Sequence, residues 1–282
     1  NPKYTFENFI VGGSNELGHA AALAVSERPG VGYNPLFIYS GVGLGKTHLL
    51  HAIGHRVMAA GLSVIYATTE EFTNEFITAI RGGQAEEFRD RYRSADVLLL
   101  DDIQFIIGKE QTQEGFFHTF NSLHMAGKQI VISSDRPANS LTLLEDRISS
   151  RLAGGLVVDI QSPDVETRLS ILSARAEQLG QSFPSEVLKF LSERVHSNIR
   201  ELEGCLNRLT AFADLASSAI TLDLVKRAIA DIIQPSSARR ISQDAVLDAV
   251  CSYFGIDHDT IMGRRRDKHT AMARQVPMYL LR

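Results

Sequence analysis

Up to residue 160, short apolar runs alternate with segments in which apolar residues recur every three or four positions. The runs are typical of buried strands, and the wider spacing is typical of amphipathic helices. Strands are therefore predicted at 36–40, 63–67, 96–101, 129–133 and 155–160. Helical segments are predicted at 14–27, 46–60, 69–80, 84–93, 110–126 and 139–151. This alternation predicts an α/β fold with a mostly parallel sheet, whose sites lie at the carboxyl ends of its strands.

The pattern becomes purely helical after Ser162-Pro163. Helical segments are predicted at 164–180, 184–196, 198–214 and 221–233. The segment 234–238 has the composition of a linker, and a third, shorter helical piece follows it. The pattern therefore predicts three domains: an α/β core over 1–163, a small helical domain over 164–233 and an all-α piece over 234–282.

A glycine-rich loop follows the first predicted strand. It reads Ser40-Gly41-Val42-Gly43-Leu44-Gly45-Lys46-Thr47 and leads into a helical segment. In a phosphate-binding loop of this kind, backbone N–H groups around Gly41, Gly43 and Gly45 point at phosphate oxygens. Lys46 is expected to reach the β and γ phosphates, and the Thr47 hydroxyl to hold Mg²⁺. The loop departs from the pattern at its first position, which is serine rather than glycine, and it still predicts binding of a nucleoside triphosphate.

Acidic residues end two of the later predicted strands. Asp101 and Asp102 follow the apolar run 97–100, which places both carboxylates beside the triphosphate. We expect Asp101 to hold Mg²⁺ through water and Asp102 to polarise the attacking water, so ATP hydrolysis follows as a capability. Asp135 follows the next strand and is a candidate sensor of the γ-phosphate. The alternative for Asp135 is an aspartate that caps the turn before Arg136-Pro137.

Three arginines are candidates for contact with the phosphates. Arg147 and Arg151 lie four positions apart on one predicted helix face. They either pair with Glu145 and Asp146 or supply an arginine finger to the ATP of a neighbouring subunit. Arg200, near the start of a helix in the second domain, is placed to swing onto the γ-phosphate and report ATP as domain closure.

Composition excludes several classes of protein. The 282 residues are 44% hydrophobic and include only Cys205 and Cys251, which excludes a disulfide scaffold and a zinc site. No apolar run approaches 18 residues and no secretory signal begins the chain, so a cytoplasmic location is expected. The first residue is not methionine, which suggests a piece of a longer protein. Residues 236–282 carry seven Arg and one Lys against five Asp, so this basic segment of an acidic chain favours an anionic partner.

These motifs, in this order, resemble the AAA+ ATPases with a helical lid, and more narrowly the DnaA family of bacterial chromosomal replication initiators. The segments that carry the resemblance are 41–50, Leu99–Phe105, Phe116–Asn121, Ser133–Pro137, Glu145–Arg151 and Asn198–Gly204. The resemblance runs from Asn8 almost to Arg282. It implies an AAA+ core with a parallel sheet, then a helical lid and a partial all-α helix-turn-helix domain.

The resemblance also implies roles that spacing does not supply. Arg151 is the implied trans-acting finger, Arg147 a second inter-subunit residue, Arg200 the lid sensor and Asp135 the core sensor. The segment from Asn8 to Gly12, including Val11, is implied to lie against the adenine of ATP or ADP. Helices around 70–93 are implied to be the initiator-specific insertion of this family. In the family, that insertion makes the subunits assemble as an open helical filament rather than a closed ring. Single-stranded DNA then lies along the filament, with Ile77 and Lys109 at matching positions, whereas Gln111 stands where many relatives carry arginine.

The basic C-terminal piece resembles the start of the family's duplex-binding domain. Candidate DNA contacts there are Arg264, Arg265, Arg266, Lys268 and Arg274. Arg266 is the candidate for contact with the minor groove. Ala273 is expected to open the next helix. The alternative is a solvated basic turn. Pro277 lies inside that helix and kinks it if it is far from the start. Because the sequence stops before the family's recognition helix, we expect little sequence-specific origin binding from this piece alone.

The function expected from these features is an ATP-dependent initiator of chromosomal replication, in which ATPase activity is a regulatory switch. The ATP-bound form is expected to oligomerise on double-stranded origin DNA and open it, and slow hydrolysis switches it off. Implied partners are single-stranded DNA, further copies of the chain, the replicative helicase and acidic phospholipids. A helicase loader is one alternative, disfavoured by the basic loop at 264–268. A protein-remodelling ATPase is another, for which Phe105–Gly108 is a weak pore-loop candidate.

Overall fold

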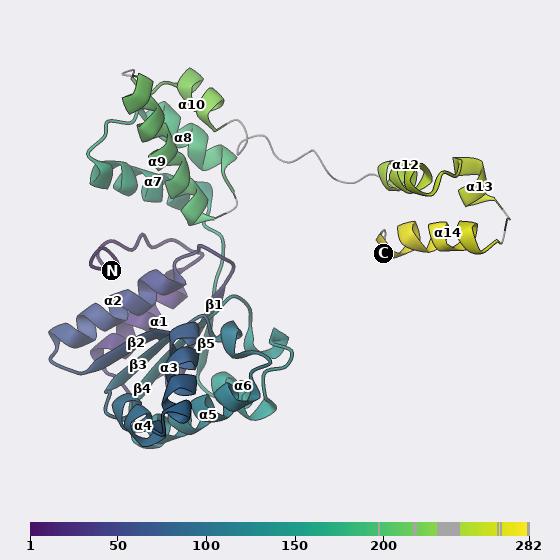
Figure 1. Cartoon of the computed structure of the whole chain (residues 1–282). Helices are drawn as coiled ribbons and strands as arrows, with labels where there is room; N and C mark the ends of the chain where they lie inside the picture. Colours follow the sequence, from purple (N-terminus) through teal and green to yellow (C-terminus); the bar gives the residue numbers. More distant parts are fainter. Residues whose placement is uncertain (197, 217–218, 230–242, 264, 266, 281–282) are drawn as a thin grey trace. The chain divides into compact units, whose positions relative to one another are not determined.

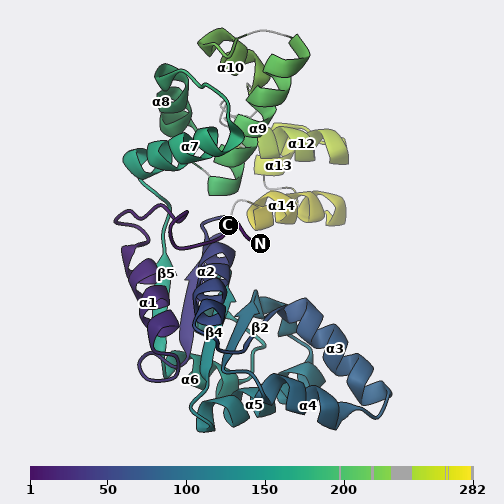
Figure 2. The ribbon, with the colours of Figure 1, turned by 90° about the vertical axis from the view of Figure 1, so that its left-hand side faces the viewer.

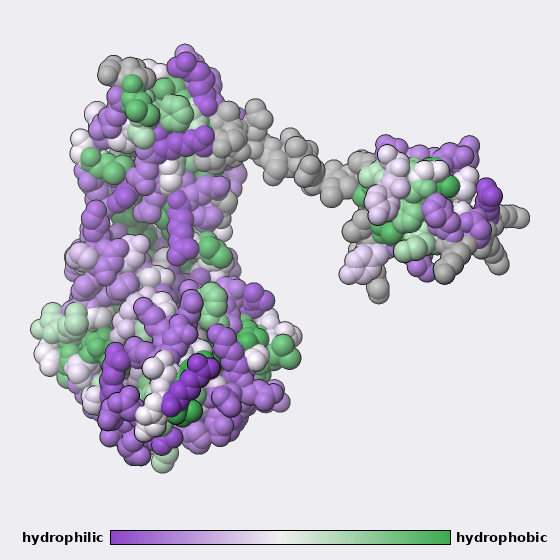
Figure 3. All heavy atoms as spheres, in the orientation of Figure 1, coloured by the Kyte–Doolittle hydropathy of each residue, from purple (hydrophilic) through white to green (hydrophobic). Residues whose placement is uncertain are grey.

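The computed structural model describes the chain except residues 197, 217–218, 230–242, 264, 266 and 281–282. It divides into two compact units, Asn1–Ala228 and Ile229–Arg282 (Figure 1). On the face shown in Figure 3, the surface of the first unit is mainly hydrophilic, with hydrophobic residues in scattered patches. Within the described residues, no helix combines the length and the apolar character needed to cross a bilayer.

A five-stranded parallel sheet forms the centre of the first unit. Its strands are β1 (Leu36–Ser40), β2 (Val64–Thr68), β3 (Val97–Asp101), β4 (Gln129–Ser134) and β5 (Leu156–Ile160). They lie in the order β2-β3-β4-β1-β5, and every adjacent pair is parallel. The α/β fold class is therefore confirmed, and each strand lies within one residue of the range predicted from its apolar run.

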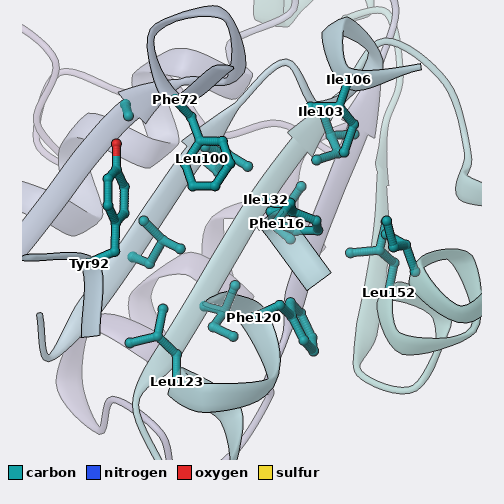
Figure 4. Close-up of a cluster of buried hydrophobic side chains, with 14 of the residues drawn as sticks. Phe72, Tyr92, Leu100, Ile103, Ile106, Phe116, Phe120, Leu123, Ile132 and Leu152 are labelled. Carbon is teal, nitrogen blue, oxygen red and sulfur yellow. The ribbon is translucent and has the colours of Figure 1, made fainter. Parts of the chain in front are cut away.

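Helices cover both faces of this sheet. On one face lie α1 (Glu16–Glu27) and α2 (Lys46–Ala59), which Figure 2 shows side by side. The other face packs against α3 (Thr69–Arg81), α4 (Ala85–Arg93), α5 (Glu110–Met125) and α6 (Asp146–Ala153). Strand residues alternate between the two layers, so that Leu99 contributes to the core under α2 while Leu100 faces Phe72 and Phe116 in the other core (Figure 4). Burial on both faces explains why the strands are continuous apolar runs.

One predicted helix, 139–151, is wrong. The structure has a 3₁₀ turn, η2 (Ala138–Ser140), and then α6, which begins only at Asp146. Leu143, between them, has φ 73°, a left-handed conformation that no α-helix can include. The buried Gln113 side chain stabilises this break, because its amide donates to the Leu143 carbonyl at 3.0 Å and accepts from the Glu145 N–H at 2.8 Å.

Four helices complete the first unit: α7 (Val165–Leu179), α8 (Ser185–Arg194), α9 (Ile199–Ala216) and α10 (Leu222–Ala228). Asp164 caps α7, since its carboxylate accepts the Thr167 N–H at 2.7 Å. Helices α7, α8 and α9 contact one another, and apolar residues at helical spacing on them are buried, among them Leu172, Leu191 and Leu206. The end of the helix predicted at 221–233, and the predicted linker at 234–238, lie outside the described residues.

The second unit contains α12 (Gln243–Phe254), α13 (His258–Met262) and α14 (Lys268–Leu280) around a small core. The expectation that Ala273 opens a helix is wrong, because α14 begins at Lys268. Asp267 sets this start: its carboxylate accepts both the N–H and the hydroxyl of Thr270, at 2.9 and 2.7 Å. Pro277 therefore lies well inside the helix rather than in its first turn.

Candidate functional site

The glycine-rich loop joins β1 to α2 at the carboxyl edge of the sheet. Gly45, the residue before α2, has φ 104°, and a Cβ there would lie 3.0 Å from the Phe9 ring. Only glycine combines this backbone conformation with so close a neighbour. The N–H groups of the first turn of α2 begin directly after this glycine, as a phosphate-binding loop requires.

Lys46 is buried in the loop and held by three oxygens. Its Nζ donates to the Ser40 carbonyl, the Ser40 hydroxyl and the Gly41 carbonyl, each at 3.0 Å. Burial lowers the pKa of Lys46, and the carboxylates of Asp102, Asp101 and Asp135 oppose that shift. The serine at the loop's first position is thereby explained. It ends β1 in register with β5 and supplies the lysine with a side-chain acceptor.

Asp101, at the end of β3, receives hydrogen bonds on both carboxylate oxygens. Thr47 and Tyr66 donate to Oδ2 at 2.7 and 3.1 Å, and the Ser133 hydroxyl donates to Oδ1. Thr69 also fixes the strand end by donating to the Asp101 carbonyl at 2.8 Å. Burial, together with the neighbouring Asp101 carboxylate, raises the pKa of Tyr66, which keeps this phenol a donor. Thr47 and Asp101, both predicted to hold Mg²⁺, are thus hydrogen-bonded to each other and offer two oxygens that suit a hard cation.

Asp102 lies beside Asp101 but is held differently. It has φ 60°, a left-handed conformation that costs a non-glycine residue about 1 kcal/mol. Its N–H donates to the Ser133 hydroxyl at 2.8 Å, and its carboxylate accepts from the Gln104 amide at 3.0 Å. The side-chain oxygen of Gln104, Oε1, in turn accepts the Asp135 N–H at 3.2 Å.

Ser133 and Gln104 were not predicted from the sequence. Ser133 is fully buried directly after the apolar run Ile130-Val131-Ile132, and such a hydroxyl requires a partner. That requirement was the one signal available. Its partners come from β3, about 30 residues away in sequence, so the pairing itself could not be read from the chain.

The end of β4 places Asp135 near the loop. Arg136 donates to its carboxylate side-on, through Nε at 2.9 Å and Nη2 at 2.8 Å, and this pairing lowers the pKa of Asp135. The Arg136 N–H instead binds the Ser134 hydroxyl at 3.3 Å. The alternative of an aspartate that caps the turn is therefore not what this carboxylate does.

A cavity of about 470 Å³ lies over the loop. Its lining includes the loop from Val42 to Thr47 and the side chains of Asp102, Gln104, Asp135, Arg200 and Glu203. Helix α9 contacts the loop directly, because the Ile199 N–H donates to the Gly43 carbonyl at 3.1 Å. Arg200 thus faces the loop, and its charge contributes to the lowered pKa of Lys46; its predicted swing onto the γ-phosphate stays a prediction.

A second cavity, of about 400 Å³, adjoins the first and shares Gly45, His48 and Ile199 with it. Apolar residues in its lining come from the N-terminal segment, from α7 and from α9, and include Phe9, Ile10, Ile171, Ala174 and Ile199. The predicted adenine segment therefore reaches this cavity through Phe9 and Ile10. Val11 lies outside the lining and its side chain is 45% exposed.

The two arginines of α6 lie outside both cavity linings and differ from each other. Arg147 pairs with Glu145, and its guanidinium lies over the Phe117 ring, 4.4 Å from the centroid. Arg151 is exposed, and within the described residues it makes no ion pair or side-chain hydrogen bond. The alternative of pairing with Glu145 and Asp146 therefore holds for Arg147 with Glu145 but not for Arg151.

The predicted DNA contacts fall on both units. In the first, Ile77 on α3 is half-buried and Lys109, which precedes α5, is exposed. In the second, Arg265 is exposed and pairs with Asp267 at 3.3 Å. Arg264, Arg266 and the Lys268 side chain lie outside the described residues.

Arg274 does not present a free guanidinium in this structure. It donates to four backbone carbonyls, those of Thr260, Ile261, Gly263 and Arg265, at 2.5–2.9 Å. Arg274 therefore joins the end of α13 to the turn that carries the basic loop. The sequence could not show this, because the four acceptors are backbone oxygens brought together only by the fold.

Each of the two units matches a family of known proteins. A family described as the bacterial DnaA ATPase domain matches residues 1–159, and one described as the bacterial DnaA helix-turn-helix matches residues 243–282. The chromosomal replication initiator protein DnaA of Chloroflexus aggregans is 56% identical, covering 100% of this chain and 59% of its own length. The chain thus spans about three fifths of that relative.

Solved structures agree with this assignment. Domain III of the replication initiation protein DnaA from Thermotoga maritima matches with 45% identity and a TM-score of 0.80, covering 83% of this chain and 99% of that one. A replication initiator DnaA bound to AMPPCP and single-stranded DNA matches with 36% identity and a TM-score of 0.72, covering 100% of this chain and 83% of that one.

Proposed function

The chain belongs to the bacterial DnaA family, and on that premise we propose that it is the nucleotide-switched part of an ATP-dependent initiator of chromosomal replication. In this proposal the ATP-bound form assembles on origin DNA and promotes its opening, and slow hydrolysis ends the active state. The observation that carries the proposal is the cluster at the carboxyl edge of the sheet, where Lys46, Thr47 and Asp102 line the cavity over the loop and the buried Asp101 accepts a hydrogen bond from Thr47.

The triphosphate is held by the loop and by α2. The N–H groups at the start of α2 and the Lys46 ammonium bind the phosphate oxygens, while adenine enters the second cavity, where Phe9 and Ile171 supply apolar contacts. Lys46 exchanges its contacts with Ser40 and Gly41 for phosphate oxygens, which are stronger acceptors. Tyr4 lines both cavities, so nucleotide binding also depends on the first residues of the chain.

The donor set fits Mg²⁺. Thr47 Oγ1 and Asp101 Oδ2 lie 2.7 Å apart, and hydroxyl and carboxylate oxygens are the ligands that this ion prefers in triphosphate sites. Among the described residues, no group of three or more His, Cys, Asp or Glu side chains is arranged to hold a metal. Thr47 and Asp101 would hold the ion beside the phosphates, and a bound Mg²⁺ would neutralise charge on them.

Hydrolysis requires a base beside the γ-phosphate. Asp102 lines the cavity, which supports its assignment as the group that accepts a proton from the attacking water. Asp135 lies at the end of the neighbouring strand, and Arg200 faces the same space from α9. We assign Asp135 as the core sensor and Arg200 as the lid sensor, which moves with α9 toward the γ-phosphate and so couples the nucleotide to domain closure.

The site is completed by a neighbouring copy of the chain. Arg151 is exposed on α6 and lies outside the cavity of its own chain, so its guanidinium is available to a neighbour's ATP. An arginine finger of this kind stabilises charge on the transferring phosphoryl group. Arg147, held by Glu145 and Phe117, is assigned to the surface that meets the neighbouring copy.

DNA contact is assigned to both units. A related DnaA binds single-stranded DNA together with AMPPCP, and Ile77 and Lys109 are the candidates for that contact in this chain. The match of residues 243–282 to a helix-turn-helix family favours an initiator over a helicase loader or a protein-remodelling ATPase. A replicative helicase, acidic phospholipids and a cytoplasmic location belong to the proposal for the whole protein.

The proposal is tested by sedimentation velocity of the chain with Mg²⁺-ATP or Mg²⁺-ADP, each with and without a single-stranded oligonucleotide. Larger assemblies are expected with ATP, growing further with the oligonucleotide, because the γ-phosphate recruits Arg151 of the next copy. Assembly that is equal in ATP and ADP would contradict the switch.

A further inference from the structure

The Gln104 side chain bridges two residues that the proposed function places next to the γ-phosphate. It belongs to the 3₁₀ turn η1 (Ile103–Ile106), which directly follows Asp102. Its Nε2 donates to Asp102 Oδ1 at 3.0 Å, and its Oε1 accepts the Asp135 N–H at 3.2 Å. It also lines the cavity over the phosphate loop.

The orientation of this amide is fixed by its two partners. The Asp135 N–H can only donate, and a carboxylate such as that of Asp102 can only accept. A flipped amide would face donor with donor and acceptor with acceptor, so one orientation alone satisfies both. A single side chain therefore joins the ends of β3 and β4 through a fixed pair of hydrogen bonds.

Asp102 has few other restraints on its carboxylate. Its backbone is fixed by the Ser133 hydroxyl and by its left-handed conformation. Within the described part of the chain, Gln104 is the only side chain that donates to the Asp102 carboxylate. Asp101 differs sharply, because three side chains donate to its two oxygens.

We infer that Gln104 is a positioning residue for ATP hydrolysis, which aims the free oxygen of Asp102 at the attacking water and ties it to the backbone of Asp135. This inference rests on the proposed function. The bond from Gln104 occupies Oδ1 and leaves Oδ2 for the water. Because the same amide is anchored to β4, a shift of Asp135 on contact with the γ-phosphate is passed to Asp102, so base and sensor move together.

Gln104→Met tests this inference, because methionine keeps the length of the side chain and removes both hydrogen bonds. We expect the single-turnover rate of hydrolysis at saturating Mg²⁺-ATP to fall about tenfold, as for the loss of one hydrogen bond to a charged group. The dissociation constant for Mg²⁺-ATP should stay within about twofold, since the nucleotide is bound by the loop. Gln104→Glu keeps the acceptor for Asp135 but sets a carboxylate against Asp102, so its hydrolysis should fall further.

Gln113→Met is the matched control. Gln113 is also a bridging glutamine, but it bonds Ile106, Leu143 and Glu145 away from the cavity. Gln113→Met should lower the melting temperature and leave the rate of ATP hydrolysis per folded molecule unchanged. Gln84→Met, at an exposed position, should change neither the melting temperature nor this rate. An unchanged rate in Gln104→Met, or a parallel loss of ATP affinity, overturns the inference. The same experiment tests the proposed function separately. ATP hydrolysis by the wild-type chain that is lost on substitution of Lys46 supports the proposed function, whatever the result for Gln104.

Discussion

The carboxyl edge of the sheet and the surface of α6 carry the two sets of charged residues proposed to act on one ATP, and they are built in opposite ways. At the sheet edge, Lys46 is buried against three acceptors and Asp101 receives three side-chain donors. On α6, Arg151 is exposed and has no hydrogen-bond or ion-pair partner within the described residues.

This difference teaches how a shared site can be divided. Residues that bind nucleotide in the same chain are held by their own fold, which removes the entropy cost of ordering them when the ligand arrives. A residue that serves a neighbour gains nothing from an internal partner, since that partner would have to be released on assembly. The unpaired state of Arg151 is therefore what a trans-acting arginine requires, whereas Arg147 is already held by Glu145 and Phe117.

The largest expected effect comes from breaking the sheet edge. Lys46→Ala removes the buried ammonium that meets the phosphates, and we expect affinity for Mg²⁺-ATP to fall about a thousandfold, measured by equilibrium binding of a fluorescent ATP analogue. Lys226→Ala, on the exposed end of α10, is the control and should bind normally. Affinity within threefold of wild type for Lys46→Ala would show that the loop does not bind the triphosphate.

A smaller effect, on the rate of ATP hydrolysis rather than on ATP affinity, is expected from a substitution in α6. Arg151→Ala should lower the hydrolysis rate of assembled protein by about a hundredfold, because a guanidinium no longer reaches the neighbour's phosphate. Its affinity for ATP as a monomer should stay within about twofold, since Arg151 does not line the cavity. Loss of ATP binding in the monomer would place Arg151 in the site of its own chain and end the comparison.

The smallest effect concerns Ser40. Ser40→Gly restores the glycine of the usual loop pattern but removes one of the three acceptors of Lys46. We expect the free energy of unfolding to fall by about 1 kcal/mol, because glycine is costly in a strand and a hydrogen bond is lost, while ATP affinity changes less than threefold. Chemical denaturation measures the first quantity. Ser40→Ala, which loses the hydroxyl alone, separates the two causes.

The sequence predicts most of the sheet edge because the signals there are local. Buried strands are apolar runs, and the phosphate loop and the Asp101-Asp102 pair are contiguous with them. Ser133 and Gln104 escaped prediction because Ser133 binds Asp101 and Asp102, and Gln104 binds the Asp135 N–H, across neighbouring strands that only the order β3-β4 brings together.

The errors elsewhere have similar causes. The helix predicted over 139–151 fails at Leu143, whose left-handed conformation is stabilised by the distant Gln113. The backbone contacts of Arg274 were also not predicted: it lies inside α14 and binds four carbonyls between Thr260 and Arg265, while its contact with DNA stays a prediction. In both cases the partner that decides the contact is a distant side chain or a backbone oxygen. The local spacing of residue types along the sequence indicates neither.

The most direct test of the central claim mixes the two variants. Lys46→Ala lacks the nucleotide-binding half of the site but keeps Arg151, and Arg151→Ala has the reverse defect. Each alone should hydrolyse ATP at a small fraction of the wild-type rate, measured as phosphate release in the presence of a single-stranded oligonucleotide. An equimolar mixture should recover a substantial part of the wild-type rate, because Arg151 of one chain completes the site of the other. A mixture no faster than the average of its two components would contradict a site shared between chains.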